Sequence, residues 1–251
     1  MFESVHLPVN PVSFGQVSTA LLRKFYEEGL FPNLFTIGKV DLSSQKQDQE
    51  FIKWIQECAN KASKKHSRET PIFKFWHIAQ SLESFSNNQS LFTFYELDQP
   101  TELELNILNN NKKVCVSSRY TKDTFETFGL SNVEYIPLFF DKTNFSISDK
   151  EYHPDRIVFN ICGKFEQRKH HVKAIRAWLK KYGNNKDYFL QCAIHNSHLS
   201  EEDNKKLVNQ IPEGKKYFNI QFIGRMQQND VYNDFLNSGD IVIGASGAEG
   251  W

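Results

Sequence analysis

The sequence lacks an excess of charge of either sign, because its 251 residues contain 30 lysines and arginines and 30 aspartates and glutamates. Proteins that bind nucleic acid usually carry a surplus of basic residues that neutralises phosphates. The sequence therefore gives no indication of a nucleic-acid partner.

Long apolar runs are also missing. The runs that occur are short, with Ile241-Val242-Ile243 as a typical example, whereas a membrane-spanning helix needs about 20 apolar residues. The first residues show no basic segment followed by an apolar one, so no secretory signal is indicated. We expect no membrane span and a cytoplasmic location.

Cysteine is scarce, and the motifs of metal and dinucleotide sites are absent. No Cys-x-x-Cys pair occurs, which favours buried free thiols over disulfides or a zinc site. No Asp-x-Asp pair, no Cys/His cluster at metal spacing and no glycine-rich dinucleotide fingerprint occurs either. We therefore expect neither a metal nor a cofactor. The four cysteines are Cys58, Cys115, Cys162 and Cys192.

The composition is that of a globular protein, with 39% hydrophobic and 14% aromatic residues. In several segments apolar residues recur at three- and four-residue steps, as Phe51, Trp54, Ile55 and Cys58 do, which predicts amphipathic helices. Short β-rich runs alternate with these helices, and this alternation predicts an α/β fold with parallel sheets. The predicted strands are 3–9, 33–37, 72–78, 90–95, 113–117, 133–136, 156–162, 188–194, 218–223 and 240–244.

One polar and irregular segment, residues 139–155, separates the predicted strands into two groups. Such a segment is typical of a linker, so we predict two Rossmann-like domains, residues 1–145 and 146–251. Ligands of these folds bind at the carboxyl ends of the strands. Side chains that directly follow a predicted strand are therefore the candidates for a site.

Gly15 lies between the first predicted strand and the helix that follows it. A glycine at a helix start lets backbone N–H groups approach an anion, and the helix dipole favours negative charge there. An ordinary strand-to-helix turn explains the same residue, because a lone glycine is a weak signal.

The segment 163–171, which we call the basic turn, directly follows a predicted strand. It contains Lys164, Arg168 and Lys169 together with two histidines. Cations at a helix start oppose the helix dipole and cost stability unless an anion joins them. A diphosphate would fit, since lysine offers a point charge and arginine a bidentate fork. The alternative is a solvated basic turn without function.

The run 240–251 places small residues and one carboxylate after the last predicted strand. Small residues such as Ser246 and Gly250 let backbone amides approach a ligand, and the Glu249 carboxylate can accept hydrogen bonds from sugar hydroxyls.

Glu96 and Asp98 follow another predicted strand and could perform acid–base chemistry or orient a hydroxyl group. Asp98 could instead help to cap the helix that begins near Thr101. His77 also follows a strand, and a satisfied core histidine is the alternative to a functional one.

In chain order these segments resemble the retaining glycosyltransferases of family 4, which have the GT-B fold of two Rossmann-like domains facing each other across a cleft. Lys164 and Lys169 match the family's Arg and Lys, five residues apart, that hold the donor diphosphate; lysine replaces the arginine. Glu249 matches the first carboxylate of the family's E-x7-E pair, which lies against the donor sugar, and Asp240 matches the Asp that precedes it. Residues 222–226 resemble the loop that contacts the nucleobase.

The first half carries further matches. Gly15 corresponds to the family's first glycine-containing loop, and Glu96, Asp98 and Pro100 look like one branch of the family with an E-x-D-x-x-P pattern. Residues 135–137 and Asp141 resemble the family's "IPxG" turn and the Asp after it, although 138–140 departs from the usual glycine-containing stretch.

The resemblance implies metal-independent transfer of a hexose, with retention, from a nucleotide diphosphate sugar to a hydroxyl group of a glycan or lipid-linked glycan. No separate cofactor is implied, and the oligomeric state is left open. The catalytic residues implied are Glu249, Glu96 and Asp98. The donor-binding residues implied are Gly15, Gly163, Lys164, Arg168, Lys169, Met226, Ser246, Gly250 and Trp251.

Two alternatives remain: a GT-B nucleotide-sugar epimerase, and a binding module that holds a nucleotide or glycan without turnover. The resemblance also implies a second Glu beyond Trp251, so we expect the second domain to be incomplete here. In that case no helix of these residues covers the 240–244 strand. We then expect a longer gene product, or a partner, to cover this face, and we expect this chain alone to show weak transfer or none.

Overall fold

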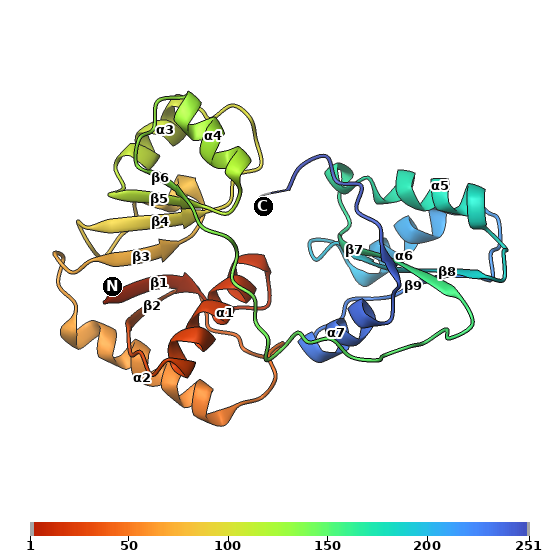
Figure 1. Cartoon of the computed structure of the whole chain (residues 1–251), viewed down its shortest axis with the longest axis horizontal. Helices are drawn as coiled ribbons and strands as arrows, with labels where there is room; N and C mark the ends of the chain where they lie inside the picture. The colour runs from red at the N-terminus through yellow and green to blue at the C-terminus, as the bar shows by residue number, and fades with distance from the viewer. Residues whose placement is uncertain (1–2, 250–251) are drawn as a thin grey trace. The chain divides into compact units, whose positions relative to one another are not determined.

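The computed structural model describes residues 3–249, and these form two α/β units, residues 3–145 with Glu249 and Ser146–Ala248 (Figure 1). Each unit is built on a sheet in which every pair of neighbouring strands is parallel. Among the helices of residues 3–249, none is long and apolar enough to cross a membrane.

The sheet of the first unit has six strands in the order β2-β1-β3-β4-β5-β6. Because β2 lies on one side of β1 and β3 on the other, the strand order reverses between β1 and β3, and such a switch point favours ligand binding at the carboxyl edge. The strands are β1 (Ser4–Pro8), β2 (Asn33–Ile37), β3 (Ile72–Phe75), β4 (Gln89–Thr93), β5 (Lys113–Val116) and β6 (Val133–Tyr135). The helices are α1 (Ser13–Glu27), α2 (Gln49–Lys65), α3 (Glu102–Asn109) and α4 (Arg119–Thr127), with a short 3₁₀ helix η1 (Ile78–Gln80).

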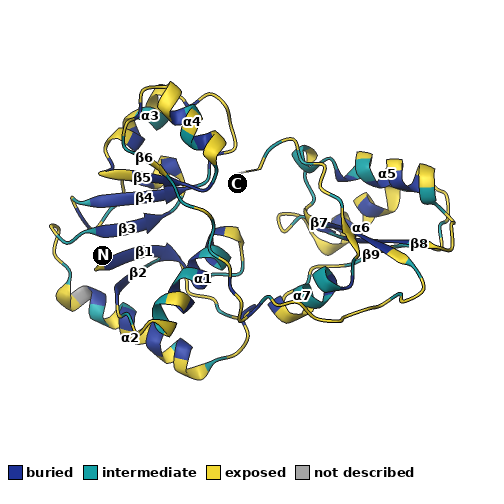
Figure 2. Ribbon diagram, in the orientation of Figure 1, coloured by how far each residue is buried: buried dark blue, intermediate teal, exposed yellow. Residues whose placement is uncertain are grey.

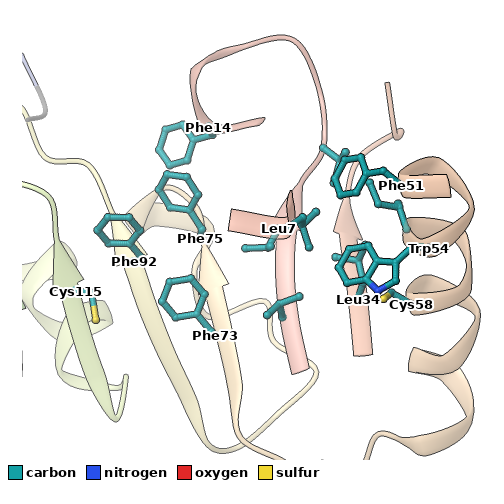
Figure 3. Packing of buried hydrophobic residues seen from close by; sticks show 14 residues of the cluster. Leu7, Phe14, Leu34, Phe51, Trp54, Cys58, Phe73, Phe75, Phe92 and Cys115 are labelled. Carbon is teal, nitrogen blue, oxygen red and sulfur yellow. The ribbon is translucent and has the colours of Figure 1, made fainter. Parts of the chain in front are cut away.

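Helices cover both faces of this sheet. The predicted apolar face of α2 is confirmed, because Phe51, Trp54 and Cys58 are buried against the face of the sheet that includes Leu34 (Figure 3). Phe14 at the start of α1 packs against Phe75 on the same face, with ring centroids 4.7 Å apart. Each such buried side chain contributes about 1.5–3 kcal/mol to folding. On the opposite face Leu91, Val114, Val116, Ile107 and Phe125 form a second cluster with α3 and α4.

The sheet of the second unit has four strands in the order β10-β7-β8-β9, so its switch point lies between β7 and β10. The strands are β7 (Ile157–Lys164), β8 (Tyr188–His195), β9 (Ile220–Phe222) and β10 (Ile241–Val242). The helices are α5 (His171–Tyr182), α6 (Glu201–Gln210) and α7 (Asn229–Asn237), with a 3₁₀ helix η2 (Gln167–Lys169) before α5. Buried residues lie along β7 and β8 and on the inner faces of the helices (Figure 2).

The two faces of this sheet are packed differently. On one face Ile161, Ile175, Trp178 and Val208 join β7 to α5 and α6 in an apolar cluster. On the other, the fully buried Asn160 donates its side-chain N–H to the Phe235 carbonyl of α7, at 2.8 Å. A buried amide must find such partners, because an unpaired one costs about 1–3 kcal/mol.

The irregular segment 139–155 contains no helix or strand, and hydrogen bonds attach its described residues to one unit or the other. Asn144 donates to the Gln45 side chain of the first unit at 2.8 Å. The backbone N–H groups of Ser146 and Ser148 donate to Asn233 and Asn237 of α7, at 3.1 and 2.8 Å.

β10 is the edge strand of the second sheet. Its side chains Ile241 and Val242 are 43% and 62% exposed.

Candidate functional site

The candidate site of the second unit is built where β7 and β10 end side by side. The basic turn follows β7, and residues 243–248, which we call the terminal loop, follow β10. The Gly247 N–H donates to the Arg168 carbonyl at 2.8 Å, and the Arg168 guanidinium donates to the Ala248 carbonyl. The structure thus brings Arg168 together with Gly247 and Ala248, in the same loop as Ser246.

A carboxylate in the basic turn binds two of its cations. Glu166 accepts from Lys164, with an Oε2–Nζ distance of 3.1 Å, and from Arg168, with an Oε1–Nε distance of 2.9 Å. Burial alone would raise the pKa of the Glu166 carboxyl, but the Lys164 hydrogen bond and the charges of Arg168, Lys164 and Lys169 hold that pKa below its usual range. Glu166 was not among the predicted site residues, although an acid enclosed by three cations within six residues was a signal for it.

Backbone geometry explains the glycines and the bend of this site. Gly163 has a φ of 124°, which glycine adopts far more readily than other residues. His170 has a left-handed φ of 52° and precedes α5, and no side chain caps that helix start. A Cβ on Gly247 would lie 3.3 Å from the His170 Nε2 atom, so a glycine allows the terminal loop to approach the basic turn closely.

The remaining candidates of the second unit take different positions. Within the terminal loop, the Ser246 hydroxyl donates to the Ala248 carbonyl at 2.8 Å. Glu249 follows this loop, groups with the first unit and is exposed. Asp240 precedes β10 at the other end of the strand, where its carboxylate accepts from the Val158 N–H at 2.7 Å, so this contact is a structural one. Gly250 and Trp251 lie outside the described residues.

Met226 is partly buried and follows β9. β8 separates β9 from β7 in the sheet, so the two strands lie about 10 Å apart. Met226 therefore follows its strand at the same edge of the sheet as the basic turn, with β8 between the two strands.

In the first unit Gly15 is buried at the start of α1, beside the loop that follows β1. A Cβ at this position would lie 2.2 Å from the Asn10 carbonyl oxygen. The close approach of the loop to the helix therefore requires glycine, which supports the alternative of an ordinary strand-to-helix turn and leaves the anion-binding prediction untested.

Aromatic side chains gather around Gly15 at the carboxyl edge of the first sheet. Phe14 lies 4.4 Å from the ring of His77, 4.7 Å from Phe94 and 5.6 Å from Trp76, measured between ring centroids. The His77 side chain is exposed and receives no hydrogen bond from residues 3–249, so it is not a satisfied core histidine. Neighbouring side chains such as Phe14 still shield part of the His77 ring from water, and this desolvation lowers the pKa of His77. The Glu96 charge opposes the shift.

Glu96 and Asp98 are both exposed after β4. The alternative that Asp98 caps α3 is wrong, because Thr101 and Glu104 cap that helix reciprocally: the Thr101 N–H donates to Glu104 at 2.8 Å and the Glu104 N–H donates to Thr101 at 3.2 Å. Tyr95 beside them is buried, and burial, with the charges of Glu104 and Asp98, raises its pKa to about 12.

Residues 3–249 contain no cluster of three or more His, Cys, Asp or Glu side chains that could hold a metal ion. All four cysteines are free thiols. Burial raises the pKa of the Cys58 thiol to about 12 and that of Cys115 to about 11, so neither is a reactive thiolate near neutral pH.

No protein-family model matches the sequence, and no curated protein does so. Solved structures, in contrast, match with low sequence identity. HepE from Anabaena in complex with UDP-glucose aligns with a TM-score of 0.60 at 13% identity, over 98% of this chain and 75% of HepE. A UDP-forming α,α-trehalose-phosphate synthase from Burkholderia vietnamiensis aligns with a TM-score of 0.59 at 8% identity, over 98% and 77% of the two chains.

TarM from S. aureus aligns over 73% of this chain with a TM-score of 0.51 at 12% identity, and the chain spans only 38% of the TarM structure. These matches agree with the parallel sheets described above. The chain therefore has an α/β fold that matches the GT-B glycosyltransferases.

Proposed function

We propose that this chain is a glycosyltransferase that moves a hexose from a nucleotide diphosphate sugar to a hydroxyl group of a glycan or lipid-linked glycan. The observation that carries the proposal is the junction of the basic turn with the terminal loop at the β7/β10 switch point, through Gly247 and Arg168. HepE, which was solved with UDP-glucose, has the same fold.

The chemistry requires charge stabilisation on the leaving group. When the bond between the sugar and the diphosphate breaks, negative charge grows on the diphosphate, and cations already in place lower the barrier. In the proposal, Lys164, Arg168 and Lys169 supply that charge, together with backbone N–H groups at the start of α5. Gly163 allows the backbone of the basic turn to bend. The segment that includes Met226 contacts the nucleobase of the donor.

The other site residues have roles in the proposal that follow from their chemistry. The Glu249 carboxylate stabilises the positive charge that develops on the sugar, and Ser246 and the glycine amides of the terminal loop hold the donor. Glu96 and Asp98 orient the acceptor hydroxyl and accept its proton. Retention of configuration and independence of metal ions are part of the proposal.

The first experiment is a thermal-shift panel with UDP, GDP, ADP and CDP sugars. A donor at 100 times its dissociation constant stabilises the protein by about 2.7 kcal/mol. We expect one base to give a clear shift and the others little. The absence of a shift with every nucleotide sugar would contradict donor binding.

Activity then distinguishes the candidate functions. The stabilising donor is incubated with glycan acceptors, and the products are analysed by mass spectrometry and NMR. Transfer with retained anomeric configuration supports the proposal, epimerised sugar nucleotide indicates the epimerase, and binding without any product indicates a binding module. A chelator such as EDTA should leave transfer intact, and a strict need for Mg²⁺ or Mn²⁺ would contradict metal independence.

A further inference from the structure

Glu166 occupies the centre of the basic turn. Its two carboxylate oxygens are each bound to a different cation, one to Lys164 at 3.1 Å and the other to Arg168 at 2.9 Å. The Glu166 side chain is 24% exposed, whereas Lys164 and Arg168 are 44% and 35% exposed. The Glu166 side chain is therefore less exposed than either of the two cations that bind it.

These contacts are the ones that a phosphate group makes. Phosphate and carboxylate both present paired oxygens to arginine and lysine at the distances of charge-assisted hydrogen bonds. A diphosphate entering the basic turn meets a lysine Nζ and an arginine Nε that already bind an anion of the chain itself.

Glu166 is not needed to place the two cations. The Lys164 backbone is fixed by its register with His195 of β8. Arg168 is fixed by the hydrogen bond from the Gly247 N–H to its carbonyl and by its own bond to the Ala248 carbonyl. Removal of the Glu166 charge therefore leaves the backbone of both cations in position.

We propose that Glu166 is an internal competitor of the donor diphosphate: it binds Lys164 and Arg168 in the unliganded protein and gives them up when the diphosphate binds. This inference rests on the proposed function, because it assumes that the basic turn binds a diphosphate. Its consequence is a lower affinity for nucleoside diphosphates, which favours the release of the nucleotide product.

The test is a calorimetric titration of UDP, ADP, GDP, CDP and inorganic pyrophosphate into the wild type and Glu166→Gln, which keeps the shape and removes the charge. We expect Glu166→Gln to bind its preferred nucleoside diphosphate, and pyrophosphate, about three- to tenfold more tightly, the range for the loss of one or two partly exposed ion pairs. Binding of the corresponding nucleoside without phosphates should not change.

The matched control is Glu213→Gln, which removes a carboxylate that pairs with Arg176 at 3.1 Å, just after α6 in the same unit. It should bind nucleoside diphosphates within twofold of the wild type. Circular dichroism checks the fold of each variant, and Glu166→Ala serves as a second variant if Glu166→Gln does not fold.

The outcomes separate the two proposals. If the wild type binds a nucleoside diphosphate and Glu166→Gln binds it equally or more weakly, Glu166 positions the cations or is neutral, and the competitor role is overturned while the proposed function stands. If neither protein binds any nucleoside diphosphate or pyrophosphate, the proposed function and the inference both fail.

Discussion

The guanidinium of Arg23 in α1 lies 3.6 Å from the carboxylate of Asp141, which follows β6, and 3.3 Å from that of Asp48 before α2. Arg23 and Asp141 are almost fully buried, with side-chain exposures of 5% and 6%. The guanidinium also lies over the Phe51 ring, at 4.1 Å from its centroid. This single side chain thus connects three segments that are distant in the sequence.

We predict that Arg23→Met destabilises the first unit by about 3 kcal/mol, because it leaves the buried Asp141 carboxylate without its cation. Urea unfolding followed by circular dichroism measures the effect. The control is Lys24→Met, which removes an exposed cation one residue further along α1 and should leave the unfolding midpoint nearly unchanged. Equal midpoints for Arg23→Met and the wild type would contradict the prediction.

Gly15→Ala should destabilise the protein by about 1–3 kcal/mol, because the added Cβ would lie 2.2 Å from the Asn10 carbonyl oxygen and force the loop or the helix to move. Gly224→Ala is the matched control, since no atom lies within 4 Å of its added Cβ. Thermal denaturation without nucleotide gives the comparison. A stable Gly15→Ala variant with weakened nucleotide binding would instead favour the role predicted for Gly15 in anion binding.

The first unit should become less stable as the pH is lowered below 6.5. His6 is buried beside the buried Lys74, and burial, with the Lys74 charge, lowers the pKa of His6 to about 4. The unfolded chain takes up this proton near pH 6.5 and the folded chain only near pH 4, so stability is complete above pH 6.5 and is lost as the pH falls toward 4. The loss is on the order of 3 kcal/mol.

His6→Phe tests this assignment, because the ring lies 5.0 Å from Phe85 and a phenyl group suits that aromatic environment. The urea midpoint of the wild type should decrease between pH 7 and pH 4.5 more than that of His6→Phe. Lys74, whose pKa burial lowers to about 8, stays charged throughout this range and contributes nothing to the difference. Parallel pH profiles would show that His6 is not the responsible group.

Lys169→Ala should weaken the binding of the preferred nucleotide sugar by about 1.5–3 kcal/mol, the cost of a lost charge-assisted contact. Folding should change little, because Lys169 lies in the short η2 segment and not in the core. Lys180→Ala removes an exposed lysine near the other end of α5 and should bind like the wild type. If both variants bind equally well, Lys169 does not hold the diphosphate.

The sequence was sufficient for the order of the elements and for the amphipathic helices, because their apolar periods report burial directly. The face of Phe51, Trp54 and Cys58 is an example. The predicted strand 72–78 ends earlier, at Phe75, because Ile78 begins η1 and turns the chain onto the other face of the sheet. Short strands carry too few residues to fix their ends by pattern alone.

The contacts of individual polar residues were less predictable, because they depend on side-chain positions in three dimensions. The basic turn was found from its charges, but the role of Glu166 between them required the two ion pairs. Asp240 matched a motif, yet its carboxylate binds the Val158 N–H of the neighbouring strand. Arg23 and Asp141 are joined only because the fold brings the segment that follows β6 back to α1, across the sheet from β6 itself.

Both switch points have a consequence for folding during synthesis. β1 pairs with β3, so Ser4 can pair only after Ile72 has been synthesised. β7 pairs with β10, so Phe159 can pair only after Ile241 has been synthesised. Parallel pairs of this kind must close long loops, which makes them slow to form. On the ribosome the basic turn is synthesised well before the terminal loop, and the β7/β10 pair can close only after residue 241 has left the exit tunnel. The candidate site is therefore among the last parts of the second unit to assemble.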